Sequence, residues 1–209
     1  MKFENLTGAS ESTGRVFDAL GGDDSDTLAR LHSRLERDAE HEDLLDVAYR
    51  TLDTPLGSLL LAATPVGLVR VAYASEGHDA VLASLADKVS PRILRAPARL
   101  DGVAREIDEY FTGSRTHFDL PLDLQLTDGF RREVIEHLSE IGYGHRESYA
   151  AVAAAIGRPR AVRAVGTACA RNPLPVVIPC HRVVRTDGSI GQYVGGVDAK
   201  QTLLTLEAA

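Results

Sequence analysis

Short hydrophobic runs alternate with turn residues between Leu45 and Ala74, and this pattern predicts the first part of the fold. Three runs rich in valine, leucine and alanine are separated by Thr-Pro-Leu-Gly at 54–57 and by Thr-Pro-Val-Gly at 64–67. Because both tetrapeptides favour tight turns, the runs predict an antiparallel meander. Further helices are predicted at 77–89 and 98–113 and further strands at 92–96 and 117–124. The pattern indicates a small α+β domain at 45–125.

After about Leu126 the spacing of apolar residues becomes helical. Residues 127–141 predict an amphipathic helix with Phe130, Val134, Leu138 and Ile141 on one face. Two short helices are expected next, the first from Ser148 to Gly157 and the second from 158 to the Asn172-Pro173 pair. A last helix is expected at 198–209. The two short helices, joined by a Gly-Arg-Pro turn, indicate a helix-turn-helix in a mostly helical domain at 126–209.

Residues 1–44 form a polar, acidic extension of unknown role. Helical spacing in 26–45 is partial, with Asp26 or Thr27 as candidate caps. His32 and His41 stand among acidic residues, but no third ligand accompanies them, so exposed helix positions are favoured over a metal site. The start of the chain has neither a signal peptide nor a membrane anchor pattern. Two cysteines build no disulfide framework, and a cytoplasmic protein is expected.

Charge is distributed unevenly along a chain whose formal net charge is −7. From Leu126 onward ten Lys/Arg and eight Asp/Glu give +2, which leaves thirteen against twenty-two, or −9, before it. Between Gly144 and Thr186 seven arginines face a single acid, Glu147; they are Arg146, Arg158, Arg160, Arg163, Arg171, Arg182 and Arg185. A solvated surface would explain this, and so would a face that binds phosphates.

The stretch from Asn172 to Val184, "NPLPVVIPCHRVV", concentrates the candidate chemistry. Its three prolines predict an extended, rigid approach to Cys180. A nucleophilic cysteine needs thiolate character, which neighbouring cations or a histidine base supply. His181 is adjacent, although consecutive side chains diverge, so a water between the two is the expected bridge. Glu207 in the last helix is a candidate to orient the imidazole, as in a catalytic triad.

Three further features complete this picture. The helix around Arg163 carries almost only small side chains, which suits either close helix packing or an approach to DNA. Tyr149 at the start of the preceding helix is either a half-buried tyrosine or a proton donor to a base. The glycine-rich loop 187–196 suits either a hairpin or a wall around a flat ligand. Together they suggest a flipped nucleotide that a thiolate attacks.

These motifs, in this order and spacing, resemble the methylated-DNA–protein-cysteine methyltransferases, also called O6-alkylguanine-DNA alkyltransferases. The carriers are "SYAAVAAAIGRPRAVRAVG", "ARNPLP", "IPCHRVV" and "GSIGQYVGG". The similarity runs from about Gly129 to Glu207, and a weaker one to the family's ribonuclease-H-like domain covers Leu45–Leu124. The resemblance implies a ribonuclease-H-like domain followed by a helix-turn-helix, winged-helix-like domain.

The resemblance also implies a role for each matching position. Cys180 would accept the alkyl group from O6-alkylguanine, while His181, through water and with Glu207 behind it, would take the thiol proton. Tyr149 would protonate guanine N3, and Arg163 would replace the flipped nucleotide in the base stack. Asn172 would brace the turn after the recognition helix, which enters the minor groove. The positions expected to bind DNA are Arg163, Tyr149, Ala164 and Gly166, and those expected to bind the base are the carbonyls of Cys180 and Val183 and the residues Tyr193, Val194, Gly195 and Gly196.

The implied reaction is a single, irreversible transfer from double-stranded DNA by a monomer that needs no cofactor, no metal and no membrane. Two departures from the family pattern concern Val194, where many relatives have serine, and Cys169, where some have a larger apolar residue. Activity on O4-alkylthymine and the range of alkyl groups stay open. Two other classes remain: a non-catalytic helix-turn-helix or lesion-recognition protein, and a thiol hydrolase that uses Cys180 and His181.

Overall fold

The computed structural model describes residues 25–42 and 44–208, and two compact units divide the chain at Leu44/Leu45. The described part of the first unit is one helix, α2 (Ser25–His41). Because this helix already includes the predicted caps, the cap assignment was wrong. Leu28, Leu31 and Leu35 are each more than half exposed. The rest of the acidic extension, residues 1–24, lies outside the described residues.

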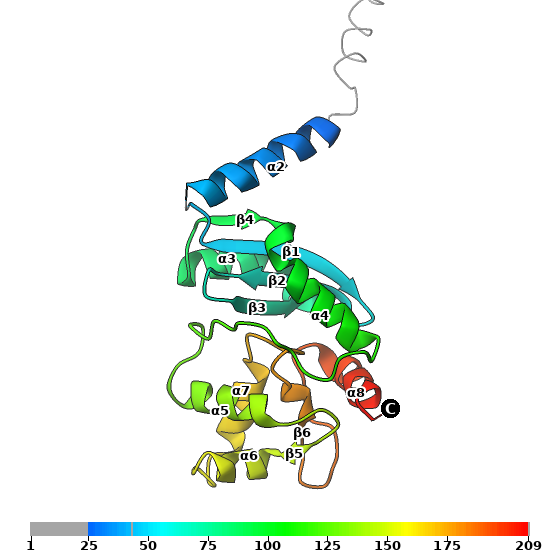
Figure 1. Cartoon of the computed structure of the whole chain (residues 1–209). Helices are drawn as coiled ribbons and strands as arrows, with labels where there is room; N and C mark the ends of the chain where they lie inside the picture. Colours follow the sequence, from blue (N-terminus) through cyan, green and yellow to red (C-terminus); the bar gives the residue numbers. More distant parts are fainter. Residues whose placement is uncertain (1–24, 43, 209) are drawn as a thin grey trace, which may run out of the picture. The chain divides into compact units, whose positions relative to one another are not determined.

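The second unit begins with a four-stranded sheet in the order β3-β2-β1-β4 (Figure 1). Strands β1 (Val47–Thr54), β2 (Gly57–Ala63) and β3 (Leu68–Tyr73) form the predicted antiparallel meander, and β4 (Ile93–Arg95) lies parallel to β1. The short 3-10 helices η1 (Ala74–Glu76) and η2 (Pro97–Leu100) precede the two helices α3 (His78–Lys88) and α4 (Asp101–Phe111). The meander and both helices confirm the sequence prediction.

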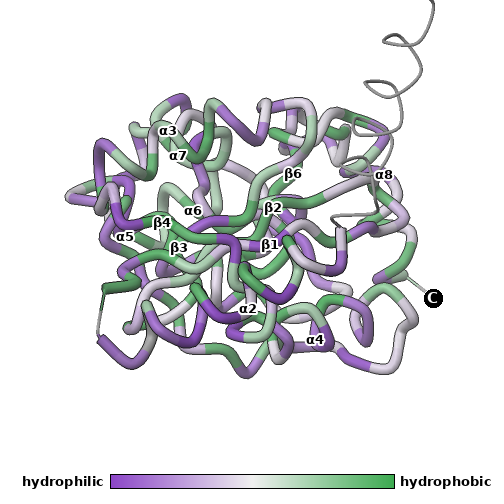
Figure 2. The backbone as a smooth tube through the Cα atoms, turned by 90° about the horizontal axis from the view of Figure 1, so that it is seen from above, coloured by the Kyte–Doolittle hydropathy of each residue, from purple (hydrophilic) through white to green (hydrophobic). Residues whose placement is uncertain are grey.

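The sheet lies between α3 and α4, as the two views agree (Figures 1 and 2). Leu60 and Ala62 pack against Val81 and Leu85 of α3. Because side chains alternate along a strand, the fully buried Leu59 and Leu61 point to the opposite face. Both faces of the sheet are therefore covered.

The strand predicted at 117–124 is not formed. This segment makes only an isolated bridge, between Leu122 and Leu68. Leu68 N–H donates to the carbonyl of Pro121 at 2.8 Å, but Pro121 itself has no N–H with which to continue a ladder. Sequence alternation alone thus overestimated the strand.

The chain then becomes mostly helical, which confirms the α+β class with a helical C-terminal part. Helix α5 (Gly129–Glu140) packs against α6 (Tyr149–Ala155) and α7 (Val162–Ala170), and α8 (Gly196–Leu206) ends the fold. Two short strands, β5 (Glu147–Ser148) and β6 (Val183–Val184), pair in parallel within this part, and the 3-10 helix η3 (Cys180–Arg182) directly precedes β6. Helix α7 begins four residues later than predicted, because Arg158–Ala161 form a turn.

Leu45–Ala209 forms one compact unit, so the division at about residue 125 stays a prediction. Among residues 25–42 and 44–208, none of the helices has the length and apolar character needed to span a bilayer. The cytoplasmic location also stays a prediction.

Candidate active site

Cys180 begins η3 and is 2% exposed. Its sulfur accepts a hydrogen bond from Asn172 Nδ2 at 3.2 Å. The same amide nitrogen donates to the Ile178 carbonyl at 2.8 Å, and Asn172 Oδ1 accepts from Leu174 N–H at 2.9 Å. Asn172 therefore closes the loop before Cys180 and contacts the thiol at the same time.

The approach to Cys180 is a turn and not the extended segment predicted from its prolines. Ile178 N–H donates to the Leu174 carbonyl at 2.8 Å, and Val176 has a φ of 74°. Positive φ is uncommon for a β-branched residue and persists only where its surroundings enforce it. The Asn172 side chain supplies hydrogen bonds at both ends of this turn.

The thiol of Cys180 is protonated in the free protein near neutral pH. Burial raises its pKa to about 11, although the Asn172 hydrogen bond and the charge of Lys200 act in the opposite direction. At pH 7 about one molecule in ten thousand would then carry the thiolate. Alkyl transfer to this sulfur requires a base that removes the proton during the reaction.

His181, the next residue, is the candidate for that base. Its Nε2 lies 2.9 Å from Glu207 Oε1, while its Nδ1 is buried and has no hydrogen-bond partner among the described residues. Burial lowers the pKa of His181, and this outweighs the opposing effect of Glu207, so the ring is neutral at pH 7. Because a carboxylate beside Nε2 favours the tautomer with its proton there, Nδ1 keeps a free lone pair.

Glu207 is held as a carboxylate by three buried side chains. Arg182 donates to it from Nε at 2.9 Å and from Nη2 at 2.8 Å, and the Tyr110 hydroxyl donates at 2.7 Å. Burial alone would raise the pKa of Glu207, but the hydrogen bonds from His181 and Arg182 lower it to about 2. The structure thus brings His181 and Glu207 together. It also places Arg182 and Tyr110 at this carboxylate, which the sequence did not indicate.

Arg182 is not part of the basic surface to which the sequence analysis assigned it. It is 7% exposed, and Nη1 donates to the Ile141 carbonyl. A run of arginines looks uniform in sequence, whereas the position of Glu207 selects this one for burial. The remaining six arginines between 144 and 186 are exposed.

Lys200 is a buried cation that the sequence analysis missed. Its side chain is fully buried, and Nζ donates to the Val183 carbonyl at 2.6 Å. Helical spacing could have indicated this burial, because Lys200 precedes Leu203 and Leu204 by three and four residues and so shares their buried face of α8. This Val183 carbonyl is one of the two that were expected to read guanine.

Tyr149 begins α6, where the Ser148 hydroxyl accepts a hydrogen bond from Ala151 N–H, as the predicted cap requires. A Cβ on Gly191 would lie 2.6 Å from the Tyr149 hydroxyl, and one on Gly166 would lie 3.9 Å from its ring. Burial raises the pKa of Tyr149, so the phenol carries its proton at neutral pH. The hydroxyl is thus placed against the loop after β6 and next to the helix of Arg163.

The glycine-rich loop is anchored by a pair of tyrosines. The hydroxyls of Tyr193 and Tyr73 are 3.0 Å apart, and their rings pack edge to face at 5.8 Å. A Cβ on Gly195 would lie 2.6 Å from Tyr73 Cζ, and Gly196 has a φ of 90°. Tyr73 comes from β3, so the first half of the fold positions the loop that carries Tyr193 and Val194.

Helix α7 presents an exposed face of small side chains. Arg163, Ala164 and Thr167 are exposed, whereas Val165 and Ala168 are buried. A groove of ≈ 610 Å³ runs along this face and is lined by residues 128–131 and by Ala164, Thr167, Ala168 and Arg171. Of the two explanations offered for the small residues, packing thus applies to Val165, while the other face is open. Within the described parts of the chain, no cluster of three metal-ligating side chains is found.

Comparison with known proteins places both parts of the chain in one family. Residues 129–209 match the model for the DNA-binding domain of 6-O-methylguanine DNA methyltransferase, and residues 47–124 match its ribonuclease-like domain. The methylated-DNA–protein-cysteine methyltransferase of Mycolicibacterium paratuberculosis is 37% identical, over 77% of this chain and 92% of the relative. The bifunctional transcriptional activator/DNA repair enzyme Ada of Escherichia coli is 40% identical, over 78% of this chain and 46% of its own length. The crystal structure of Mycobacterium tuberculosis OGT in complex with DNA has a TM-score of 0.67 at 34% identity and covers 77% of this chain and 92% of that one.

Proposed function

Because the chain belongs to the methylated-DNA–protein-cysteine methyltransferase family, it is a DNA-repair methyltransferase, and we propose that Cys180 is its alkyl acceptor. The substrate is O6-alkylguanine in duplex DNA. The observation that carries the assignment is the buried Cys180 thiol, bonded to the Asn172 amide and followed by a neutral His181. Cys169 is also buried, but burial raises its pKa further, and no base with a free lone pair neighbours it in sequence.

The chemistry begins with removal of the thiol proton. Nδ1 of His181 takes it, through a water, and the resulting imidazolium is stabilised by the carboxylate of Glu207 at 2.9 Å. The sulfur attacks the alkyl carbon, a C–S bond forms, and the bond between that carbon and guanine O6 breaks. The electron pair of the broken bond passes to the base.

Tyr149 lowers the energy of the departing base. Its phenol donates a proton at guanine N3, so that the base leaves without negative charge, and the phenolate is then reprotonated by the proton that the thiol released. In the balanced reaction the Tyr149 proton ends on guanine, the thiol proton restores the Tyr149 phenol, and the alkyl group ends on sulfur. A thioether has no leaving group that water displaces at neutral pH, so each molecule reacts once.

The exposed face of α7 contacts DNA. Its small residues, Ala164 and Gly166 among them, let the helix backbone approach a minor groove, and Arg163 fills the space of the flipped nucleotide. The loop with Tyr193, Val194, Gly195 and Gly196 covers the base in the site, and the carbonyls of Cys180 and Val183 accept from its amino group. All of these residues belong to one chain, so a monomer suffices.

The test is mass spectrometry after incubation with duplex DNA that contains one O6-methylguanine. One added CH2 per protein on the Cys180 peptide is expected, with no addition in Cys180→Ala and an undiminished addition in the matched variant Cys169→Ala. A parallel duplex with O4-methylthymine measures the lesion range. An unchanged mass despite tight binding of the lesion would instead indicate a recognition protein.

A further inference from the structure

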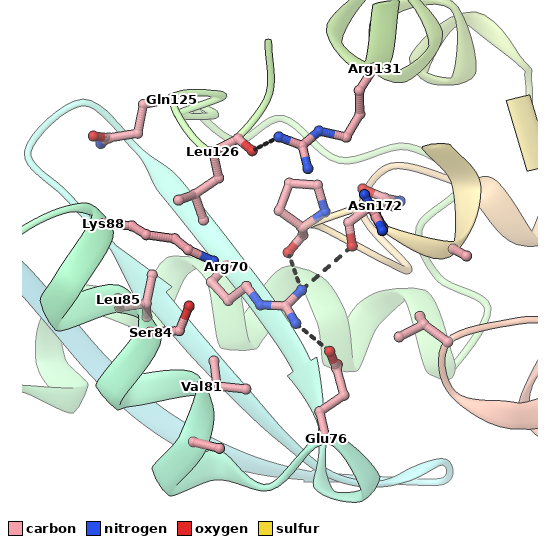
Figure 3. A pocket seen from close by; sticks show the side chains of 15 residues that line it. Arg70, Glu76, Val81, Ser84, Leu85, Lys88, Gln125, Leu126, Arg131 and Asn172 are labelled. Atoms are coloured by element: carbon pink, nitrogen blue, oxygen red, sulfur yellow. Dashed lines mark hydrogen bonds and ion pairs between the residues drawn. The ribbon is translucent and has the colours of Figure 1, made fainter. Parts of the chain in front are cut away.

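Arg70 of β3 lies in a pocket of ≈ 670 Å³ that is also lined by Asn172 and Pro173 (Figure 3). Its side chain is 16% exposed. Nη1 is shared among three backbone carbonyls, that of Val71 on the same strand at 3.1 Å, that of Pro173 at 3.2 Å and that of Asn172 at 3.5 Å. Arg70 thereby links the sheet to the residue that contacts the acceptor thiol, 102 positions further along the chain.

Further hydrogen bonds hold both partners of the contact between Arg70 and the Pro173 carbonyl. Val71 N–H donates to the same Pro173 carbonyl at 2.9 Å, so this carbonyl accepts from both the backbone and a side chain of the edge strand β3. On the other side of the guanidinium, Nη2 forms an ion pair with Glu76. Glu76 is fixed in turn, because its Oε1 accepts from Tyr73 N–H at 2.9 Å. Figure 3 shows Arg70 between Glu76 and the carbonyls of this loop.

The held segment continues directly to the nucleophile. Arg70 and β3 fix the main chain at Asn172 and Pro173, and the Asn172 side chain reaches Cys180 Sγ at 3.2 Å. A hydrogen bond to an ionised sulfur is stronger than one to a neutral thiol, so its geometry matters most when the proton leaves. A displaced amide would lose that preference for the thiolate.

We propose that Arg70, oriented by Glu76, is a positioning residue for alkyl transfer: it fixes the Asn172 main chain so that the Asn172 amide meets the developing Cys180 thiolate. The inference rests on the proposed function of Cys180. A guanidinium suits the task because its planar donors address a carboxylate and carbonyls at once, which an ammonium group does less well. Arg70 touches neither the thiol nor, in the proposed reaction, the base.

The experiment measures the reactivity of Cys180 against pH in Arg70→Met and Arg70→Lys. Alkylation of the Cys180 peptide by iodoacetamide, followed by mass spectrometry, reports the apparent pKa of the thiol, and free O6-benzylguanine reports alkyl transfer without DNA. We expect the apparent pKa to rise by about one unit in Arg70→Met and transfer to slow about tenfold. Arg70→Lys should lose nearly as much, since it keeps the charge but not the fork.

The matched control is Arg50→Met. Arg50 Nη1 also donates to a backbone carbonyl, that of Pro97 at 3.2 Å, and pairs with Asp101 at 2.6 Å, with 21% of its side chain exposed. Both partners lie in the first half of the fold, so the Cys180 titration should match that of the parent.

A titration in Arg70→Met that superimposes on the parent curve would overturn the proposal, and so would an equal change in Arg50→Met. If Arg70→Met fails to fold, Arg70→Lys and Glu76→Gln carry the same comparison, with a smaller rise expected for Glu76→Gln. The iodoacetamide titration needs no alkyl transfer, so failure of the proposed function would appear separately, as a parent protein that does not react with O6-benzylguanine.

Discussion

Glu207 accepts hydrogen bonds from Arg182 and Tyr110 and contacts His181. The Glu207→Gln variant should therefore be less stable, and its free energy of unfolding should depend less on pH. Glu207 is 6% exposed, and its pKa falls from the ordinary 4.5 to about 2 in the folded protein. Because the folded-state pKa is the lower one, the unfolded chain binds the proton more readily. The stabilisation is therefore complete above about pH 4.5 and disappears as the pH falls towards 2.

The magnitude follows from the difference between the two pKa values. At about 1.4 kcal/mol per pKa unit, a difference of roughly 2.5 corresponds to about 3 kcal/mol of unfolding free energy. Removing one partner of a buried ion pair costs about 3–5 kcal/mol, because the other charge stays buried, here that of Arg182. The two figures agree, so the gap between parent and Glu207→Gln should be about 3 kcal/mol or more at pH 7. By linkage it should narrow by about 1.4 kcal/mol at pH 3.5.

Urea unfolding followed by circular dichroism at pH 7, 5, 4 and 3.5 measures this gap. The control is Glu133→Gln, which removes an exposed ion pair with Arg158 at 3.1 Å and should cost less than about 1 kcal/mol. A gap for Glu207→Gln that stays constant from pH 7 to 3.5, or one no larger than that of Glu133→Gln, would refute the account of this site.

Three further predictions concern catalysis. Burial lowers the pKa of His181 below 6.5, so the rate of transfer from O6-benzylguanine should be constant above that pH. In His181→Ala the rate should instead rise about tenfold per pH unit towards the thiol pKa of about 11. A rate that stays constant with pH in this variant would contradict the role of His181 as base. Arg163→Ala should slow transfer from duplex DNA about tenfold or more in rapid-quench assays and leave O6-benzylguanine unaffected, since only the duplex requires a flipped base; equal losses on both substrates would exclude the proposed role. Gly195→Ala should slow transfer from both substrates, because the new methyl would lie 2.6 Å from the Tyr73 ring. The control is Gly102→Ala on helix α4, where a Cβ meets no heavy atom within 4 Å. This control should keep the transfer rate and gain about 0.5–1 kcal/mol of stability in urea unfolding. An unchanged rate in Gly195→Ala would show that the loop needs no such anchor.

The sequence was most informative where one short motif carried both position and chemistry. Cys180 and His181 are adjacent in a single run, and the analogy with a catalytic triad, together with the family resemblance, singled out Glu207 near the end of the chain as the partner of His181. The structure brings them within 2.9 Å. Ser148 as a helix cap and Gly157 as a helix stop were equally local, and both were confirmed.

Contacts between distant residues could not be predicted in this way. Tyr110 lies 97 positions before Glu207 and has the spacing of an ordinary core residue of α4, so no local pattern indicates the partner of its hydroxyl. Arg70 reads as a polar residue on an edge strand, and its partners Asn172 and Pro173 follow a hundred positions later. In both cases the packing of the two halves, and not the local sequence, determines the partner.

The high pKa of Cys180, the proposed nucleophile, and the low pKa of its neighbour His181 have one physical origin, which is burial. Desolvation disfavours the Cys180 thiolate and the His181 imidazolium alike, so the resting pair is neutral. Moving a proton from sulfur to Nδ1 creates both charges together, and each then stabilises the other in a medium of low dielectric constant. The Glu207 carboxylate stabilises the His181 imidazolium. The charge of Arg182 destabilises the imidazolium, but Arg182 also keeps Glu207 ionised. In the proposed reaction, the free protein therefore keeps Cys180 as an unreactive thiol, and a bound electrophile beside the sulfur makes the proton transfer productive.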